Sequence, residues 1–208
     1  MVEALPDPRS IALALAITIA LLGVAGAIVG TDSFQDEGPL ADRLFNLVNE
    51  KTIPAFFSGA ILVAGGLCSL LAARCRLYGR HRLWIGFGAL LILMSADEVV
   101  QFHERIESWT GVDWEQPYLV VVLGAAVIWV KIVRLMDHVP RVMMICGAVC
   151  WAISYALEDA EYDSSDNRVG AFTPLAISEE LLEMAGSSLF LLALVVALKA
   201  NARRPSYA

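Results

Sequence analysis

The chain has 208 residues, 58% of them hydrophobic, and a mean hydropathy of +0.64. An ordinary soluble domain has about 45–50% apolar residues, so this composition favours a polytopic helical membrane protein. The chain has four cysteines and three histidines, and no two cysteines form a CxxC pair. This argues against a disulfide scaffold or a Cys/His zinc knuckle. With a net charge of −7 and no basic groove pattern, nucleic acid is not an expected partner.

Six apolar segments are long enough to cross a hydrocarbon core about 30 Å thick at a rise of about 1.5 Å per residue. We therefore predict an all-α, polytopic transmembrane helical bundle, with residues 1–208 forming a single integral membrane domain. The first segment lacks a strongly basic preceding region, so we interpret it as a retained span rather than a cleaved signal. The predicted spans are residues 11–29, 53–73, 83–106, 117–136, 142–160 and 175–198.

The link between the first two spans, residues 31–51, is the longest of the outer links. Within it, Leu40, Leu44, Leu47 and Val48 recur at helical spacing. This pattern predicts a short helix on the outer membrane interface, packed on the rim of the bundle.

Basic residues separate the two sides of the predicted bundle. All but four of the fifteen lysines and arginines lie near the N-terminus, after the second and fourth spans, or after the sixth span. The positive-inside rule therefore predicts that both termini are cytoplasmic, and we expect a bacterial cytoplasmic (inner) membrane. The opposite, outer face is strongly anionic, so we expect it to concentrate cations and to offer a docking surface for a basic protein partner. The four basic residues on that outer side are Arg43, Lys51, Arg105 and Arg168.

Carboxylates gather in the outer third of three predicted spans. Asp97 lies roughly 20 Å from the inner start of the third span, and Glu183 lies roughly 12 Å below the outer start of the sixth. Ionisable groups at such depths are costly and usually mark function. In the third span, Asp97, Gln101, Glu104 and Ser108 are spaced at i, i+4, i+7 and i+11, so they form one narrow stripe on the predicted helix.

Several ionised carboxylates cannot share a low-dielectric pocket, so protons or a bound cation must neutralise them. The sequence predicts a site for a divalent metal ion (Fe, Mn, Zn or Ca), mononuclear or dinuclear and rich in oxygen ligands. Helix-bundle di-iron proteins use similar ligands, but neither helix here carries their Glu-x-x-His motif. Glu158 is the candidate proton acceptor. The candidate metal ligands are Asp97, Glu98, His103, Glu104, Glu179, Glu180 and Glu183.

Simpler interpretations compete for some of these residues. Glu179 and Glu180 would suit a helix N-terminus, where the helix dipole favours anions. His103 could be an interfacial residue paired with Glu107, one turn further on.

Three functions fit the pattern. The first is a membrane metalloprotein, extending to a metalloenzyme that acts on a lipid-like substrate arriving from the surrounding membrane lipid. The second is a non-catalytic subunit or assembly factor of a larger membrane complex. The third is proton or cation translocation through the buried acids, although the inner half of the spans has few of the polar groups that a path requires.

Overall fold

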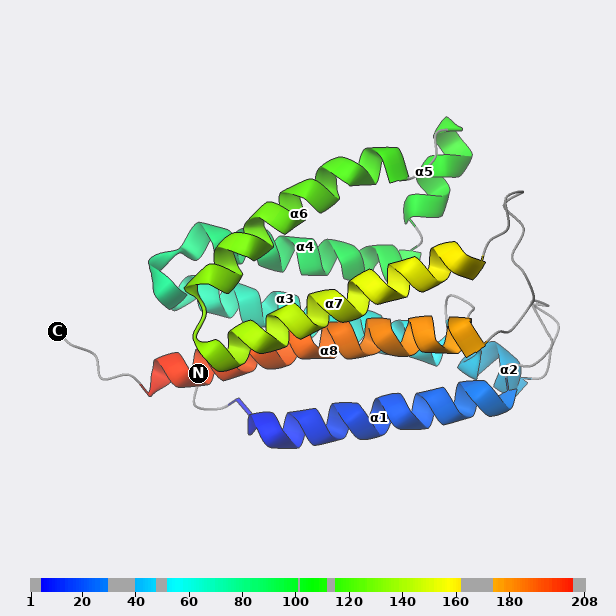
Figure 1. Ribbon diagram of the computed structural model, residues 1–208, viewed down its shortest axis with the longest axis horizontal. Helices are drawn as coiled ribbons and strands as arrows, with labels where there is room; N and C mark the ends of the chain where they lie inside the picture. Colours follow the sequence, from blue (N-terminus) through cyan, green and yellow to red (C-terminus); the bar gives the residue numbers. More distant parts are fainter. Residues whose placement is uncertain are drawn as a thin grey trace.

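The computed structural model describes residues 5–29, 40–47, 52–100, 102–111, 115–161 and 174–203, and over these ranges the regular structure is entirely helical (Figure 1). The elements in chain order are α1 (Pro8–Val29), α2 (Leu40–Phe45), α3 (Ile53–Arg74), the 3₁₀ turn η2 (Leu77–Gly79), α4 (His81–Val100), α5 (Phe102–Thr110), α6 (Glu115–Leu135), α7 (His138–Glu161) and α8 (Pro174–Ala202).

Within the described ranges, six helices are long and apolar enough to span a membrane, as the sequence predicts: α1, α3, α4, α6, α7 and α8. Their bounds agree with the predicted spans to within a few residues at most ends. The start of α1 and the end of α8 lie at the same end of the bundle (Figure 1). We call this the basic end, because the arginine-rich turns after α3 and α6 also lie there. The other end is the acidic end.

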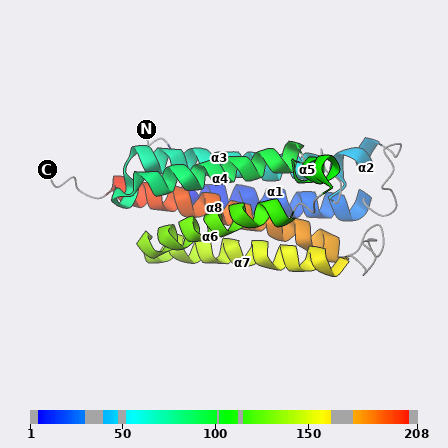
Figure 2. The ribbon, with the colours of Figure 1, turned by 90° about the horizontal axis from the view of Figure 1, so that it is seen from above.

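Helix α8 is the centre of the bundle and the most buried of the six spans. It packs against α7, α3 and α1. Figure 2 shows α3 and α4 along one edge and α7 along the other, with α8 between them. The second half of α8 enters the main apolar core, where the rings of Phe190 and Phe87 of α4 meet edge to face at 6.3 Å. This core fills the half of the bundle next to the basic end.

Glycines allow two pairs of helices to approach closely. A Cβ added at Gly88 of α4 would lie 3.0 Å from the carbonyl oxygen of Gly66 of α3, and one at Gly147 of α7 would lie 2.9 Å from that of Gly186 of α8. Backbones in membrane bundles come this close where side chains are small. The α3–α4 contact is reinforced by Ser95, whose hydroxyl donates to the Gly59 carbonyl at 2.8 Å.

The predicted short helix in the first link is confirmed as α2. Just after it, Leu47 is only 2% exposed and packs with Leu22 of α1 and Met184 of α8. Gly26 of α1 provides the space, because the Leu47 side chain occupies the position that a Cβ would take. This segment therefore closes the rim of the bundle at the acidic end. Val48, the last residue of the predicted pattern, lies outside the described residues.

The third predicted span, residues 83–106, is wrong as one continuous helix. Helix α4 ends at Val100, and α5 begins at Phe102 as a separate helix. Both views draw α5 at a steep angle to α4 (Figures 1 and 2). Glu104 and Ser108 belong to α5, so the predicted stripe of Asp97, Gln101, Glu104 and Ser108 does not lie along a single helix. Gln101 and the Glu104 side chain lie outside the described residues.

Candidate functional site

The acid-bearing segments meet at the acidic end of the bundle. Asp97 and Glu98 lie in the last turn of α4, while Glu179, Glu180 and Glu183 lie in the first half of α8. Helices α4 and α7 finish at the end of the bundle where α8 begins (Figure 1). The antiparallel arrangement thus places the carboxylates of α4 and α8 toward the same end of the bundle.

Asp97 is fixed by a residue that the sequence analysis did not single out. The hydroxyl of Tyr118, in the first turn of the spanning part of α6, donates to Asp97 Oδ1 at 2.7 Å. Both side chains are partly buried. This contact joins α6 to α4, and it turns the Asp97 carboxylate toward a neighbouring helix.

Glu183 is fixed in the same way at a different pair of helices. The hydroxyl of Ser154, in α7, donates to Glu183 Oε1 at 3.0 Å. Ser154 is 0% exposed, so this bond lies inside the α7–α8 contact. Gly186 lies three residues after Glu183 and forms the close crossing with α7. The prediction that Glu183 and Gly186 share an inward face of α8 agrees with both contacts.

The helix-capping interpretation of Glu179 and Glu180 does not fit the start of α8. The helix begins at Pro174, and its first turn contains no acidic residue. The favourable interaction of anions with a helix N-terminus falls off within that turn. Glu179 is only 9% exposed. It lies one turn before Glu183 on the same helical face, so α8 carries two carboxylates at the level of the α7 contact.

Three of the predicted site residues have side chains outside the described part of the structure. His103 and Glu104 belong to α5, not to the helix of Asp97. Glu158 belongs to α7, one turn after Ser154. The roles predicted for these three residues stay predictions.

Among the residues that the structure describes, no group of three or more histidine, cysteine, aspartate and glutamate side chains is arranged to hold a metal ion. Two of the described acids accept hydrogen bonds at separate helix contacts, Asp97 between α4 and α6 and Glu183 between α7 and α8. Adjacent residues on a helix point about 100° apart, so Glu98 and Glu180 diverge from Asp97 and Glu179. The predicted carboxylate cluster is therefore not formed by the described side chains alone.

The apolar core bounds the site on its inner side. Toward the basic end, α4 and α8 contribute Trp84, Phe87, Leu91, Leu194 and Leu198, which are nearly or fully buried. The carboxylates consequently lie on the acidic-end side of a tightly packed apolar layer.

A family model described as a domain of unknown function, DUF8692, matches residues 11–198, nearly the whole chain. The chain belongs to this family. The match covers every spanning helix of this DUF8692 member apart from the first residues of α1 and the last of α8, so its acidic end and its basic end both fall within the family domain. A search of curated proteins found no match. A search of solved structures also found none.

Proposed function

We propose that this protein is an integral membrane metalloprotein that binds a divalent cation at the acidic end of its bundle. The observation that carries the proposal is the setting of Glu183, a carboxylate within a spanning helix that is oriented by the buried hydroxyl of Ser154. Ligating carboxylates are typically held by such hydrogen bonds from neighbouring side chains. A carboxylate placed inside a membrane helix is costly unless it has a function.

The ligands would come from opposed helices. Glu179 and Glu183 of α8, with Asp97 and Glu98 of α4, supply the oxygen ligands that Mn²⁺, Fe²⁺, Ca²⁺ or Zn²⁺ accepts. His103 and Glu104 of α5 would complete the coordination, as would Glu180 of α8, and Glu158 would accept a proton from bound water. A lipid-like substrate arriving from the adjacent leaflet is the substrate class that suits this depth.

The packing favours this proposal over translocation. A proton or cation path would need polar groups through the half of the bundle next to the basic end. The described part of that half is instead filled by the apolar core around Trp84, Phe87 and Phe190. A site that is accessible from the acidic end agrees better with this packing.

Metal content tests the proposal. Full-length protein is purified in detergent without chelators, and bound metals are measured by elemental mass spectrometry in the wild type, Glu183→Gln and Asp7→Asn. Asp7 is an exposed acid at the basic end, and its Oδ2 accepts a hydrogen bond from the backbone N–H of Arg9, a bond that asparagine can also accept. We expect near-stoichiometric metal in the wild type and Asp7→Asn and its loss in Glu183→Gln. An empty wild type, or metal retained by Glu183→Gln, would overturn the proposal.

Orientation is the second part of the proposal: we infer that the basic end faces the cytoplasm, as the positive-inside rule predicts, across the inner membrane of a bacterium. In a cysteine-free background, Trp109→Cys places a thiol on exposed α5, and Arg203→Cys places one just after α8. A membrane-impermeant maleimide should label only the residue 109 thiol in intact cells. Labelling of the residue 203 thiol alone would show that the orientation is the opposite of the one we infer.

A further inference from the structure

A cavity of about 600 Å³ lies at the basic end, between the turn that begins α4 and the last turn of α6. One wall is formed by η2 and the start of α4, and the other wall by α6. Because both helices are membrane-spanning, the cavity lies where the chain emerges from the bilayer. Its polar lining residues are Arg80, His81, Arg82, Lys131 and Arg134.

The two walls are tied together close to the cavity. The hydroxyl of Tyr78 in η2 donates to Asp137 Oδ2 at 3.1 Å, and the N–H of Asp137 donates back to the Tyr78 oxygen at 3.4 Å. Asp137 follows the end of α6, so these bonds join the α3–α4 turn to the α6–α7 turn. Tyr78 takes a left-handed conformation with φ of 53°. Such a conformation is costly for a residue with a side chain and persists only where its surroundings fix it.

The cavity is positively charged, and no carboxylate of the described residues lines it. Arg80 and Arg82 on one wall face the same space as Lys131 and Arg134 on the other. Within the described ranges, no ion pair occupies these four side chains. The start of α4 adds the positive end of its helix dipole, which favours anions. These features are complementary to a phosphate group.

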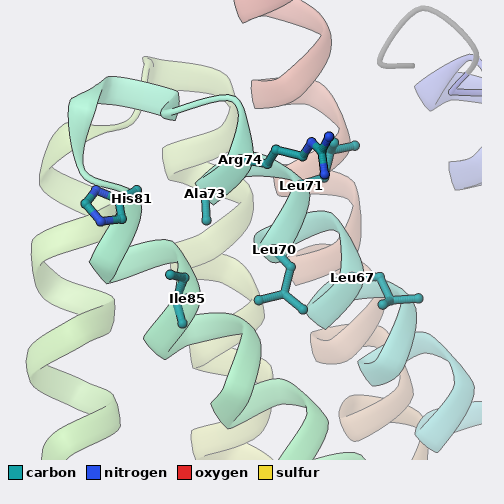
Figure 3. Close-up of a pocket in the computed structure, with 7 residues that line it drawn as sticks. All are labelled: Leu67, Leu70, Leu71, Ala73, Arg74, His81 and Ile85. Carbon is teal, nitrogen blue, oxygen red and sulfur yellow. The ribbon is translucent and has the colours of Figure 1, made fainter.

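An apolar groove adjoins this cavity. A second hollow of about 710 Å³ is formed along α3 and α4, and His81 lines both hollows. In Figure 3, Leu67 and Leu70 follow from Arg74 along α3, and Ile85 follows from His81 along α4. All three apolar side chains are exposed, with no described segment of the chain covering them. The groove thus runs from the charged cavity into the depth of the hydrocarbon layer.

We propose that the basic end binds an anionic phospholipid, with the phosphate among Arg80, Arg82, Lys131 and Arg134 and an acyl chain along the groove between α3 and α4. Basic pockets between membrane helices on the cytoplasmic side suit anionic lipid headgroups. The combination of a charged cavity and an apolar groove selects the lipid rather than a free phosphate, which would leave the groove unused. This lipid site is independent of the proposed metal site.

Lipid titration followed by native mass spectrometry tests this inference. Full-length protein in detergent is titrated with dioleoyl phosphatidylglycerol and, separately, with dioleoyl phosphatidylcholine, and then with phosphatidylglycerol in excess inorganic phosphate. Arg82→Gln/Arg134→Gln removes one charge from each wall. Arg9→Gln/Arg203→Gln is the matched control, because it removes two exposed charges at the same end that do not line the cavity.

We expect phosphatidylglycerol to bind more tightly than phosphatidylcholine, and excess inorganic phosphate to displace it poorly. At about 1 kcal/mol per basic residue, the cavity variant should bind about 30-fold more weakly, and the control variant should lose much less affinity. If the cavity variant folds poorly, Lys131→Gln, at an exposed position, should weaken binding about fivefold.

Three results would overturn the inference. Equal binding of the two lipids would show that the headgroup charge is not recognised. Ready displacement by inorganic phosphate would show a site for free anions only. An equal loss of affinity in the control variant would show that the surface charge acts diffusely rather than through this cavity.

Discussion

At the basic end, several side chains donate to backbone carbonyls near the ends of helices, whereas at the acidic end two carboxylates accept from hydroxyl groups on neighbouring helices. The Arg141 guanidinium donates to the Val133 carbonyl at 3.1 Å and to the Met136 carbonyl at 2.6 Å, and the Trp84 indole donates to the Leu77 carbonyl at 2.8 Å. At the other end, the carboxylates Asp97 and Glu183 accept from hydroxyl groups instead.

The difference matters because the last carbonyls of a helix need partners in any fold. The bonds at the basic end satisfy such groups, so they stabilise the turns between helices. The carboxylates of Asp97 and Glu183 accept from side-chain hydroxyls, and a carboxylate offers more acceptor positions than one hydroxyl donor uses. Removing one of these backbone bonds at the basic end should therefore affect stability alone, whereas removing a bond to a carboxylate at the acidic end should also affect metal binding.

The largest expected effect is at Trp84, which is 0% exposed in the apolar core. Trp84→Ala should lower the free energy of unfolding by about 3–5 kcal/mol, because it leaves a large cavity. Denaturation in detergent, followed by circular dichroism, measures this change. Trp109 is 81% exposed, and Trp109→Ala should have little effect. Equal destabilisation by the two variants would contradict the assigned core.

The next effect is expected at the α7–α8 crossing. Gly147→Ala places a Cβ 2.9 Å from the Gly186 carbonyl oxygen, a backbone atom that cannot move aside easily. The free energy of unfolding should fall by about 1–3 kcal/mol. Gly124→Ala in α6 is the matched control, because within the described residues its added Cβ would have no contact within 4 Å beyond the backbone of its own helix. An unchanged melting curve for Gly147→Ala would contradict the close crossing.

Changing one serine at each end of the bundle to alanine allows the two ends to be compared directly. Ser154 bonds to the Glu183 carboxylate, and Ser69 bonds to the Trp84 carbonyl at 2.7 Å. Each change to alanine should cost about 0.5–1.5 kcal/mol of stability. Only Ser154→Ala should weaken metal binding, by about 10–100-fold, because only Ser154 orients a predicted ligand. Mn²⁺ titration of chelator-treated protein provides the readout, and equal affinities for the two variants would remove the functional distinction.

The smallest effect is expected from a matched pair of tyrosines. Tyr118→Phe removes the bond to Asp97, while Tyr78→Phe removes the bond to Asp137 at the opposite end. Hydrogen bonds between membrane helices contribute about 0.6 kcal/mol on average, so both stability changes should be small. Tyr118→Phe should also lower Mn²⁺ affinity. If Tyr78→Phe lowers the Mn²⁺ affinity as much as Tyr118→Phe does, metal binding does not depend specifically on the acidic end.

The sequence predicts the six spans and α2 well, because hydropathy and helical periodicity depend on local residues alone. It fails at the α4–α5 break, since the residues around Val100 remain compatible with a helix and carry no sign of a change in direction. This failure matters for function, because it puts His103 and Glu104 on a different helix from Asp97. If His103 and Glu104 bind the proposed metal, they do so from α5 and not from the helix that carries Asp97.

The partners of the carboxylates could not be predicted for another reason. Ser154 and Tyr118 lie on helices other than those of Glu183 and Asp97. Which residues face each other across two helices depends on how the helices pack, and spacing along one chain does not specify that. The glycine pair Gly147 and Gly186 offers the most useful signal, because small residues on adjacent spans indicate the faces in contact.

The proposed metal site depends most on whether Asp97 of α4 and Glu183 of α8 bind one ion. A double-mutant cycle of Mn²⁺ affinity, with Asp97→Asn, Glu183→Gln and the combined variant, tests this most directly. Ligands of one site act as a unit, so their effects are not additive. We expect each single change to abolish most of the binding, and the combined variant to be little worse than either. No Mn²⁺ binding by the wild type, or independent and additive losses, would contradict a shared metal site.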